Sequence, residues 1–103
     1  MFAVIYLFTV KPGQVKNFIK AWKDMTVLLF ENEGSLGSRL HKQNEHKYIA
    51  YAQWPDRNTW ENSGSKLPKI SKDIRKIMKD SCEKIETLFE LQVIEDLITK
   101  NQY

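Results

Sequence analysis

The stretch GSLGSRLHKQNEHKYIAYAQWPDRNTW, residues 34–60, holds two strand-like runs, a polar link and the start of a helix. Residues 36–42 and 47–54 flank the link QNEH, whose length suits a β-hairpin, so we expect the two runs to pair antiparallel. A proline ends the second run, and the carboxylate of Asp56 is placed to cap a short helix that carries Trp60. The stretch therefore predicts a hairpin that leads directly into a helix.

The flanking sequence supplies the remaining elements. Residues 2–9 are eight β-favouring residues without polar alternation, which is typical of a central strand buried on both sides. Apolar residues recur every three or four positions from residue 14 to a stop at Gly34, and again over 67–78, which predicts two amphipathic helices. Residues 85–94 alternate as in a strand. The apolar spacing at their end also fits a helix, but the density of β-favouring residues favours the strand.

This order of elements is the split βαβ arrangement of the ferredoxin-like α+β fold, βαββαβ. We expect one domain over residues 1–103, with a four-stranded antiparallel sheet and two helices on one face. The first and third strands are apolar on both faces, so the face without helices would expose a patch of roughly several hundred Å², which a soluble monomer seldom tolerates. Sheet-on-sheet association of two copies would bury this face, and we therefore predict a homodimer.

Composition argues against several classes of function. Sixteen basic and 13 acidic residues give a net charge of only +3, and no aromatic residues interleave with the lysines of the second long helix, so we expect no nucleic-acid partner. The apolar N-terminus is too short to span a bilayer, so we expect no membrane partner. The single cysteine, Cys82, favours a cytoplasmic protein, and no histidine lies near it in sequence to activate a catalytic thiol. No metal-ligand spacing or phosphate-binding loop is present.

Three segments together carry a resemblance to a known family. VKPGQVKNFIKAW follows the first strand, GSLGSRLHK opens the hairpin and YIAYAQWPDRNTW leads into the second helical region. In this order and spacing the chain resembles the antibiotic biosynthesis monooxygenase family, whose fold is the dimeric α+β barrel. The resemblance implies a barrel made of two sheets, with a pocket in each subunit between its sheet and its helices. It also implies oxidation of a small aromatic or quinone-like substrate by molecular oxygen, with no flavin, metal or other cofactor.

One branch of that family degrades haem, and it is marked by an asparagine in the first strand, a tryptophan and an iron-binding histidine. Only the tryptophan is present here, as Trp60. Tyr6 stands at the asparagine position and the vicinity of Ile70 at the histidine position, while His41 and His46 both lie upstream. The resemblance therefore does not extend to haem degradation.

Candidate catalytic residues are His41, Tyr51 and Trp60. Oxygenation without a cofactor asks for a dry pocket, a group that helps to form the substrate anion and polar contacts that orient it. The indole of Trp60 can stack on a flat ligand or anchor helix to sheet as a core residue. Tyr51 can bind a substrate oxygen or be satisfied by the backbone. His41 is the better placed base of the two histidines, although it is also an ordinary residue for an exposed edge strand.

Candidate substrate-binding residues are Tyr6, Trp22, Arg39, Asn58 and Asn62. Arg39 shares a strand face with His41, and the two can stabilise an enolate or phenolate. Trp22 and Trp60 are candidate pocket walls, together with an aromatic residue of the third strand, where Tyr48 and Trp54 share one face and Tyr51 lies on the other. Tyr6, like Tyr51, can bind a substrate oxygen or be satisfied by the backbone or the dimer partner. The two asparagines flank Trp60 and can bind a ligand carbonyl, although helix capping explains them equally well.

The sequence therefore leaves two hypotheses. The first is a cofactor-independent monooxygenase that holds an aromatic substrate between sheet and helices. The second is a non-catalytic dimer of the same fold that binds a small molecule or serves as a structural module, because fold alone does not establish an activity.

Overall fold

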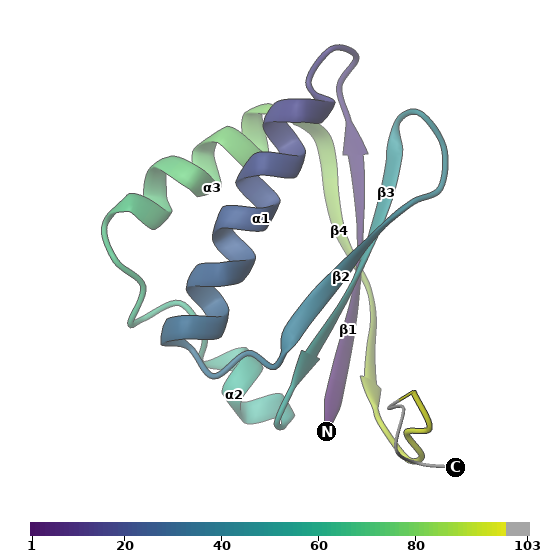
Figure 1. Cartoon of the computed structure of the whole chain (residues 1–103), viewed down its shortest axis with the longest axis vertical. Helices are drawn as coiled ribbons and strands as arrows, with labels where there is room; N and C mark the ends of the chain where they lie inside the picture. The colour runs from purple at the N-terminus through teal and green to yellow at the C-terminus, as the bar shows by residue number, and fades with distance from the viewer. Residues whose placement is uncertain (99–103) are drawn as a thin grey trace.

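The computed structural model describes residues 1–98, which form four strands and three helices (Figure 1). In chain order they are β1 (Phe2–Val10), α1 (Val15–Asn32), β2 (Gly37–Lys42), β3 (Lys47–Trp54), α2 (Arg57–Glu61), α3 (Ile70–Asp80) and β4 (Cys82–Gln92). The strands form one antiparallel sheet in the order β2-β3-β1-β4. The ferredoxin-like α+β fold predicted from the sequence is therefore confirmed.

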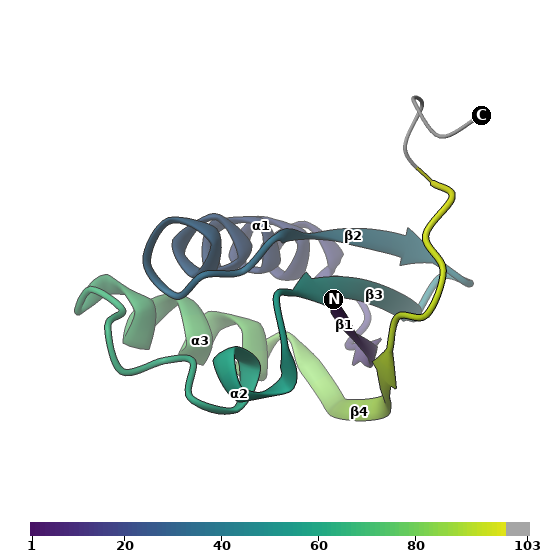
Figure 2. The same ribbon diagram turned by 90° about the horizontal axis from the view of Figure 1, so that it is seen from below.

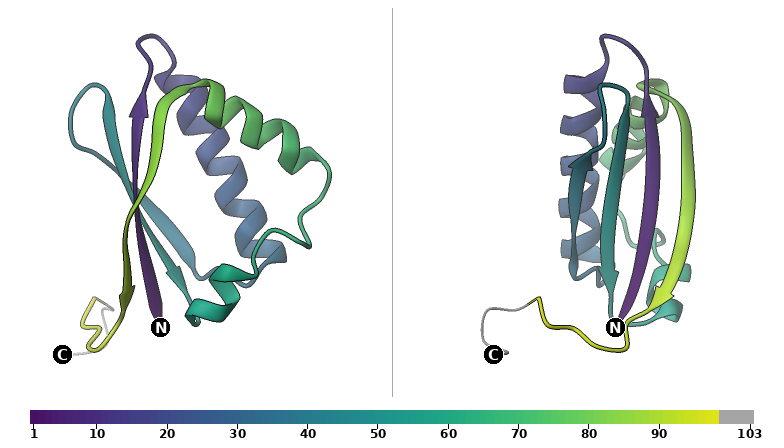
Figure 3. Two further views of the ribbon diagram at one scale, coloured as in Figure 1. Left: turned by 180° about the vertical axis from the view of Figure 1, so that it is seen from behind. Right: turned by 90° about the vertical axis from the view of Figure 1, so that its right-hand side faces the viewer.

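The two long helices cover one face of the sheet. Seen from below, α1 and α3 lie side by side against the same face (Figure 2). The opposite face, which we call the open face, carries no helix and is turned toward the viewer in the right-hand view of Figure 3. The short α2 follows β3 and lies at the end of the sheet where β1 begins (Figure 1).

The core lies between the sheet and the helices. Phe18 of α1 has no exposed surface, and its ring packs at a tilt against those of Phe8 and Tyr48, at centroid distances of 4.9 Å and 5.6 Å. Alternation along β1 sends Val4 and Phe8 to this side and Ile5 to the open face, where it is only half-buried. The uniformly apolar first strand is thus the central strand that the sequence predicts, with one of its faces uncovered.

The boundaries of the last helix and strand differ from the prediction. Helix α3 begins at Ile70, because the Pro68 carbonyl accepts a hydrogen bond from Ser71 in the turn before the helix, so Pro68 lies outside it. Strand β4 begins three residues earlier than predicted and ends at Gln92, and residues 93–98 are neither strand nor helix.

A β-bulge interrupts the pairing of β4 with β1. Ile5 pairs with Phe89 but Tyr6 pairs with Thr87, so Leu88 is left without a partner in the register. Thr87 consequently faces the helices, whereas Phe89 faces away from them. In a regular strand Thr87 and Phe89 would share a face, as the alternation in the sequence suggests, but the bulge places them on opposite faces.

Candidate functional site

A cavity of about 240 Å³ lies between the sheet and the helices, and we call it the inner cavity. Its walls are mainly apolar and aromatic, as is usual for small-molecule sites. The lining residues are Tyr6, Phe8, Trp22, Met25, Thr26, Leu29, Ser35, Ser38, Ala52, Trp54, Trp60, Ser63, Arg75, Met78 and Ile85. Three of the predicted site residues, Tyr6, Trp22 and Trp60, meet here.

Helix α2 fixes the position of Trp60. The Asp56 carboxylate caps the helix by accepting hydrogen bonds from the Thr59 backbone N–H at 2.7 Å and from its hydroxyl at 2.8 Å. These hydrogen bonds lower the pKa of Asp56 from its ordinary value. On the next residue, the Trp60 indole N–H donates to the Tyr6 hydroxyl oxygen at 2.8 Å. The predicted cap is confirmed, and it places Trp60 in the cavity wall.

The Tyr6 hydroxyl accepts a hydrogen bond from Trp60, and its raised pKa disfavours a role as a base. Burial raises the pKa of its hydroxyl, the hydrogen bond from Trp60 works in the opposite direction, and the charge of Glu90 raises the pKa further. Because Trp60 occupies an acceptor position on the oxygen, the phenolic proton is available for another partner. Tyr6 can therefore donate to an oxygen atom of a bound ligand.

One further lining residue was not found by the sequence reasoning, whereas Trp54 was one of the strand-three aromatic residues expected as a pocket wall. Arg75 of α3 is among the lining residues although it is exposed overall, and within residues 1–98 no carboxylate lies within 4.0 Å of its guanidinium nitrogens. Its only sequence signal is a basic residue beside the apolar positions Ile74 and Met78. Trp54 also lines the cavity, and its buried indole N–H has no hydrogen-bond partner among the described residues.

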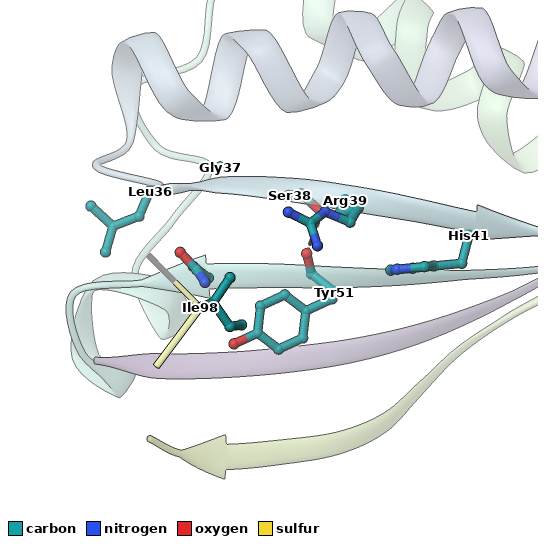
Figure 4. Close-up of a pocket in the computed structure, with 8 residues that line it drawn as sticks. Leu36, Gly37, Ser38, Arg39, His41, Tyr51 and Ile98 are labelled. Atoms are coloured by element: carbon teal, nitrogen blue, oxygen red, sulfur yellow. Dashed lines mark hydrogen bonds between the residues drawn. The ribbon is translucent and has the colours of Figure 1, made fainter. Parts of the chain in front are cut away.

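His41, Tyr51 and Arg39 lie on the open face. They line a second cavity of about 450 Å³, the outer cavity, together with Leu36, Gly37, Ser38, Gln53 and Ile98. Figure 4 shows Tyr51 beside Ile98 and His41 further along the strands, with these two side chains turned away from α1. Arg39 pairs directly with Tyr51 across the strands, and His41 Nδ1 lies 3.1 Å from the Ile49 carbonyl oxygen. The sheet thus separates His41 and Tyr51 from Trp60, and the three candidate catalytic residues are not brought together.

The two asparagines beside Trp60 serve α2 itself. The Asn62 side-chain amide donates to the Asn58 carbonyl oxygen at 2.9 Å and to the Asn58 side-chain oxygen at 3.0 Å. Both residues are exposed, and neither lines the inner cavity. The capping interpretation therefore accounts for their contacts.

Neither the cysteine nor any cluster of metal-binding side chains provides a second candidate active site in the described part of the chain. Cys82 is buried, and burial raises the pKa of its thiol to about 11, which disfavours a thiolate. Within residues 1–98 no three histidine, cysteine or acidic side chains gather as a metal site would require. None of the helices in this range is long and apolar enough to cross a membrane.

Solved structures with the same fold include one cofactor-independent oxygenase and other members of uncharacterised activity. SnoaB, a cofactor-independent oxygenase from Streptomyces nogalater, aligns with a TM-score of 0.75 and 12% identity, over 95% of this chain and 97% of that chain. A candidate antibiotic biosynthesis monooxygenase from Caulobacter crescentus aligns with a TM-score of 0.71 and 21% identity, over 91% and 90%. A conserved protein from Methanosarcina mazei gives 0.67 and 17%, over 84% and 89%. At these identities the likeness establishes the fold.

Sequence comparison supplies the family. A comparison with curated proteins finds no match. The family profile described as antibiotic biosynthesis monooxygenase matches residues 1–65, which include β1, α1, the hairpin and α2 with Trp60. This match covers more than half of the chain, and the protein belongs to the antibiotic biosynthesis monooxygenase family.

Proposed function

We propose that the inner cavity binds a flat phenolic or hydroquinone-like molecule and that molecular oxygen oxidises it there without a cofactor. The observation that carries this proposal is the Trp60–Tyr6 pair in a mainly apolar cavity that Arg75 also lines. An indole can stack on the ring, a phenol can donate to its oxygen, and a cation can balance its charge. Membership of the family supports the same chemistry.

Electron balance restricts the substrate. Reduction of molecular oxygen to one product oxygen atom and one water consumes four electrons in total, and without a reductant the substrate must supply all of them. A phenol with a free para C–H meets this condition, because its oxidation to a quinone gives up the O–H and C–H hydrogens. One oxygen atom becomes the second carbonyl, and the other leaves as water with both hydrogens. We therefore propose phenols with an open para position.

The cavity stabilises the substrate anion but contains no base to form it. No histidine or carboxylate is among its lining residues, and Tyr6 is held protonated. Arg75 lowers the energy of a bound phenolate, and the phenol proton leaves to solvent before binding. The rate should therefore rise with pH until the phenol itself is ionised, and not follow the titration of a protein group.

Oxygen uptake with paired phenols tests this function. Phenols with a free para position should consume one oxygen molecule each and take up one labelled atom from ¹⁸O₂, whereas their para-methyl counterparts should not. Trp60→Ala should lower the rate at least tenfold. His41→Gln, on the other side of the sheet, is the matched control and should leave the rate unchanged. Oxygen uptake that is indifferent to Trp60→Ala would contradict the inner cavity as the site.

A homodimer formed through the open face is the second part of the proposal. Phe89 and Leu91 are 58% and 45% exposed there, and Ile5, Leu7 and Ile49 beside them are only half-buried. Burial of this surface in a symmetric sheet-on-sheet contact would stabilise two copies. Sedimentation at micromolar concentration should give twice the chain mass of 12.2 kDa. A stable 12.2 kDa species would contradict the dimer.

The absence of a base among the lining residues also favours the alternative of a small-molecule-binding dimer without catalysis. In that case phenols should quench the fluorescence of the cavity tryptophans without any oxygen uptake. Either function suits a cytoplasmic protein, because the one cysteine is buried as a free thiol.

A further inference from the structure

We propose that the indole N–H of Trp54 donates a hydrogen bond to a second oxygen atom of the ligand in the inner cavity, so that the site selects phenols that also carry an acceptor such as a ketone. This inference rests on the proposed function and deepens it, because it assigns a specificity-determining residue to the same cavity. Tyr6 and Trp60 bind one end of the ligand, and Trp54 binds the other.

The Trp54 side chain contains a buried donor without an acceptor. Trp54 is only 3% exposed, and its indole N–H has no hydrogen-bond partner among the described residues. The residues buried in the same core cluster, Phe2, Val4 and Ala52, have apolar side chains. An unpaired buried donor costs free energy, and a buried indole N–H usually has a partner. Because Trp54 also lines the inner cavity, a ligand bound there can supply the missing acceptor.

The hydroxyl groups of the cavity wall, in contrast, already have partners within the chain. The Tyr6 oxygen accepts from Trp60, as described above. The aliphatic hydroxyl groups are bonded to the backbone: Thr26, Ser38 and Ser63 donate to carbonyl oxygens at 2.7, 3.0 and 2.6 Å, and Ser35 accepts from the Gly37 N–H at 3.0 Å. Within residues 1–98 the N–H of Trp54 is the one buried side-chain polar group that is left unpaired.

The strand register separates Trp54 from Tyr6 along the cavity. Trp54 pairs with Phe2 and Tyr6 pairs with Ala50, and both residues line the inner cavity. They are therefore four positions apart along adjacent strands, which is roughly 14 Å between their Cα atoms. Ala52 lies between them on β3 and also lines the cavity, where its small side chain leaves space for a ligand. A ligand over Ala52 can bind Tyr6 with one oxygen and Trp54 with another.

The volume of the cavity limits the size of such a ligand. An apolar cavity of about 150 Å³ holds one benzene molecule, so the inner cavity, at about 240 Å³, has room for roughly two fused rings. An indole N–H can only donate, so the second oxygen of the ligand must be an acceptor. A ketone on the second ring meets this condition and lies away from a hydroxyl group on the first. The ligand class is therefore a bicyclic hydroxyketone.

Two bicyclic phenols that differ only by a ketone oxygen test the assignment. One is the hydroxytetralone whose hydroxyl group lies para to the ring carbon that bears the ketone, and the other is the tetrahydronaphthol of the same skeleton. Neither has a free para C–H, so binding is measured without oxidation.

Isothermal titration calorimetry at mildly acidic pH, where both phenols are protonated, should give roughly fivefold tighter binding of the ketone to the unchanged chain. In Trp54→Phe this preference should disappear, because an aromatic ring is kept and the donor is lost. Trp22→Phe, at another lining tryptophan, is the matched control and should keep the preference. Trp60→Ala should weaken the binding of both ligands, since both occupy the inner cavity.

A preference for the ketone that persists in Trp54→Phe would overturn the assignment, and so would equal binding of the two ligands to the unchanged chain. Should Trp54→Phe fail to fold, the indole N–H resonance of Trp54 in the unchanged chain gives the same test by NMR. The ketone should shift this resonance downfield and the tetrahydronaphthol should not, and the absence of a difference would overturn the assignment. Failure of both ligands to bind would overturn the inner cavity as an aromatic site. Binding that depends on Trp54 without oxygen uptake from para-unsubstituted phenols would overturn only the proposed reaction.

Discussion

The Trp60 indole N–H donates a 2.8 Å hydrogen bond to the Tyr6 hydroxyl oxygen, which joins α2 to the centre of β1 across 54 residues of sequence. Trp60→Phe keeps an aromatic ring but removes this donor. The pKa of Tyr6 should then rise above its present value, because the hydrogen bond lowers it. The free energy of unfolding should fall by about 1 kcal/mol. Tyrosinate absorbance and urea unfolding measure the two effects, and Trp22→Phe should not change the tyrosine titration.

Glu90 should act on the same hydroxyl in the opposite direction. Its negative charge raises the pKa of Tyr6, so Glu90→Gln should lower that pKa. The substitution also breaks the contact between Glu90 and Arg57, whose guanidinium lies 4.8 Å from the centre of the Phe2 ring. Because this ion pair is exposed, stability at neutral pH should change little. An unchanged or raised tyrosine pKa in Glu90→Gln would contradict the electrostatic contact.

Alkaline pH should destabilise the fold through Cys82. Burial raises the pKa of its thiol from 9.0 to about 11, so between these values the unfolded chain loses a proton that the folded chain retains. The contribution is fully present below pH 9 and is lost as the pH rises through about 11. Urea unfolding midpoints should therefore decline over this range. The decline should be shallower in Cys82→Ser, and an identical decline would assign it to other groups.

Gly34 should tolerate alanine less well than Gly13. Both have positive φ, +79° and +78°, so the backbone strain of about 1–2 kcal/mol is common to both substitutions. A Cβ at Gly34 would also lie 3.2 Å from the Thr59 methyl carbon, whereas one at Gly13 meets no atom within 4 Å. Gly34→Ala should be the more destabilising in urea unfolding. Thr59→Ser removes the methyl group and keeps the hydroxyl, so in that background the difference should disappear.

The strands and helices were largely predictable, because their signals are local. Strand β3 has the predicted bounds, since a continuous run of apolar and aromatic residues defines it and Pro55 ends it. The face of the sheet on which each side chain lies was predictable in part, because period-two alternation separates Tyr51 from Trp54. Alternation does not show which of the two faces the helices cover. The sequence therefore groups His41 and Tyr51 with Trp60, although the sheet lies between them.

The remaining parts of the site depend on contacts between distant residues. Trp60 meets Tyr6 only because α2 folds back onto the sheet, and no spacing rule records that contact. Arg75 belongs to a helix with several exposed basic residues, and its proximity to the cavity depends on how that helix rotates against α1. The bulge at Leu88 could not be predicted either, since apolar and polar residues continue to alternate in the sequence on both sides of it.

The bulge at Leu88 lies between two carboxylates of β4, Glu86 and Glu90, that face opposite sides of the sheet. Glu86 and Glu90 are four residues apart and would share a face in a regular strand, but the single unpaired residue between them puts Glu86 on the open face and Glu90 on the face of Tyr6 and Arg57. Deletion of Leu88 would make Thr87 and Phe89 consecutive partners of Tyr6 and Ile5, so it would remove the bulge and leave both carboxylates on their present faces. The two carboxylates therefore lie on opposite faces because their partners Val4 and Leu7 are three residues apart in β1, and the bulge absorbs the one additional residue that β4 has over the same length.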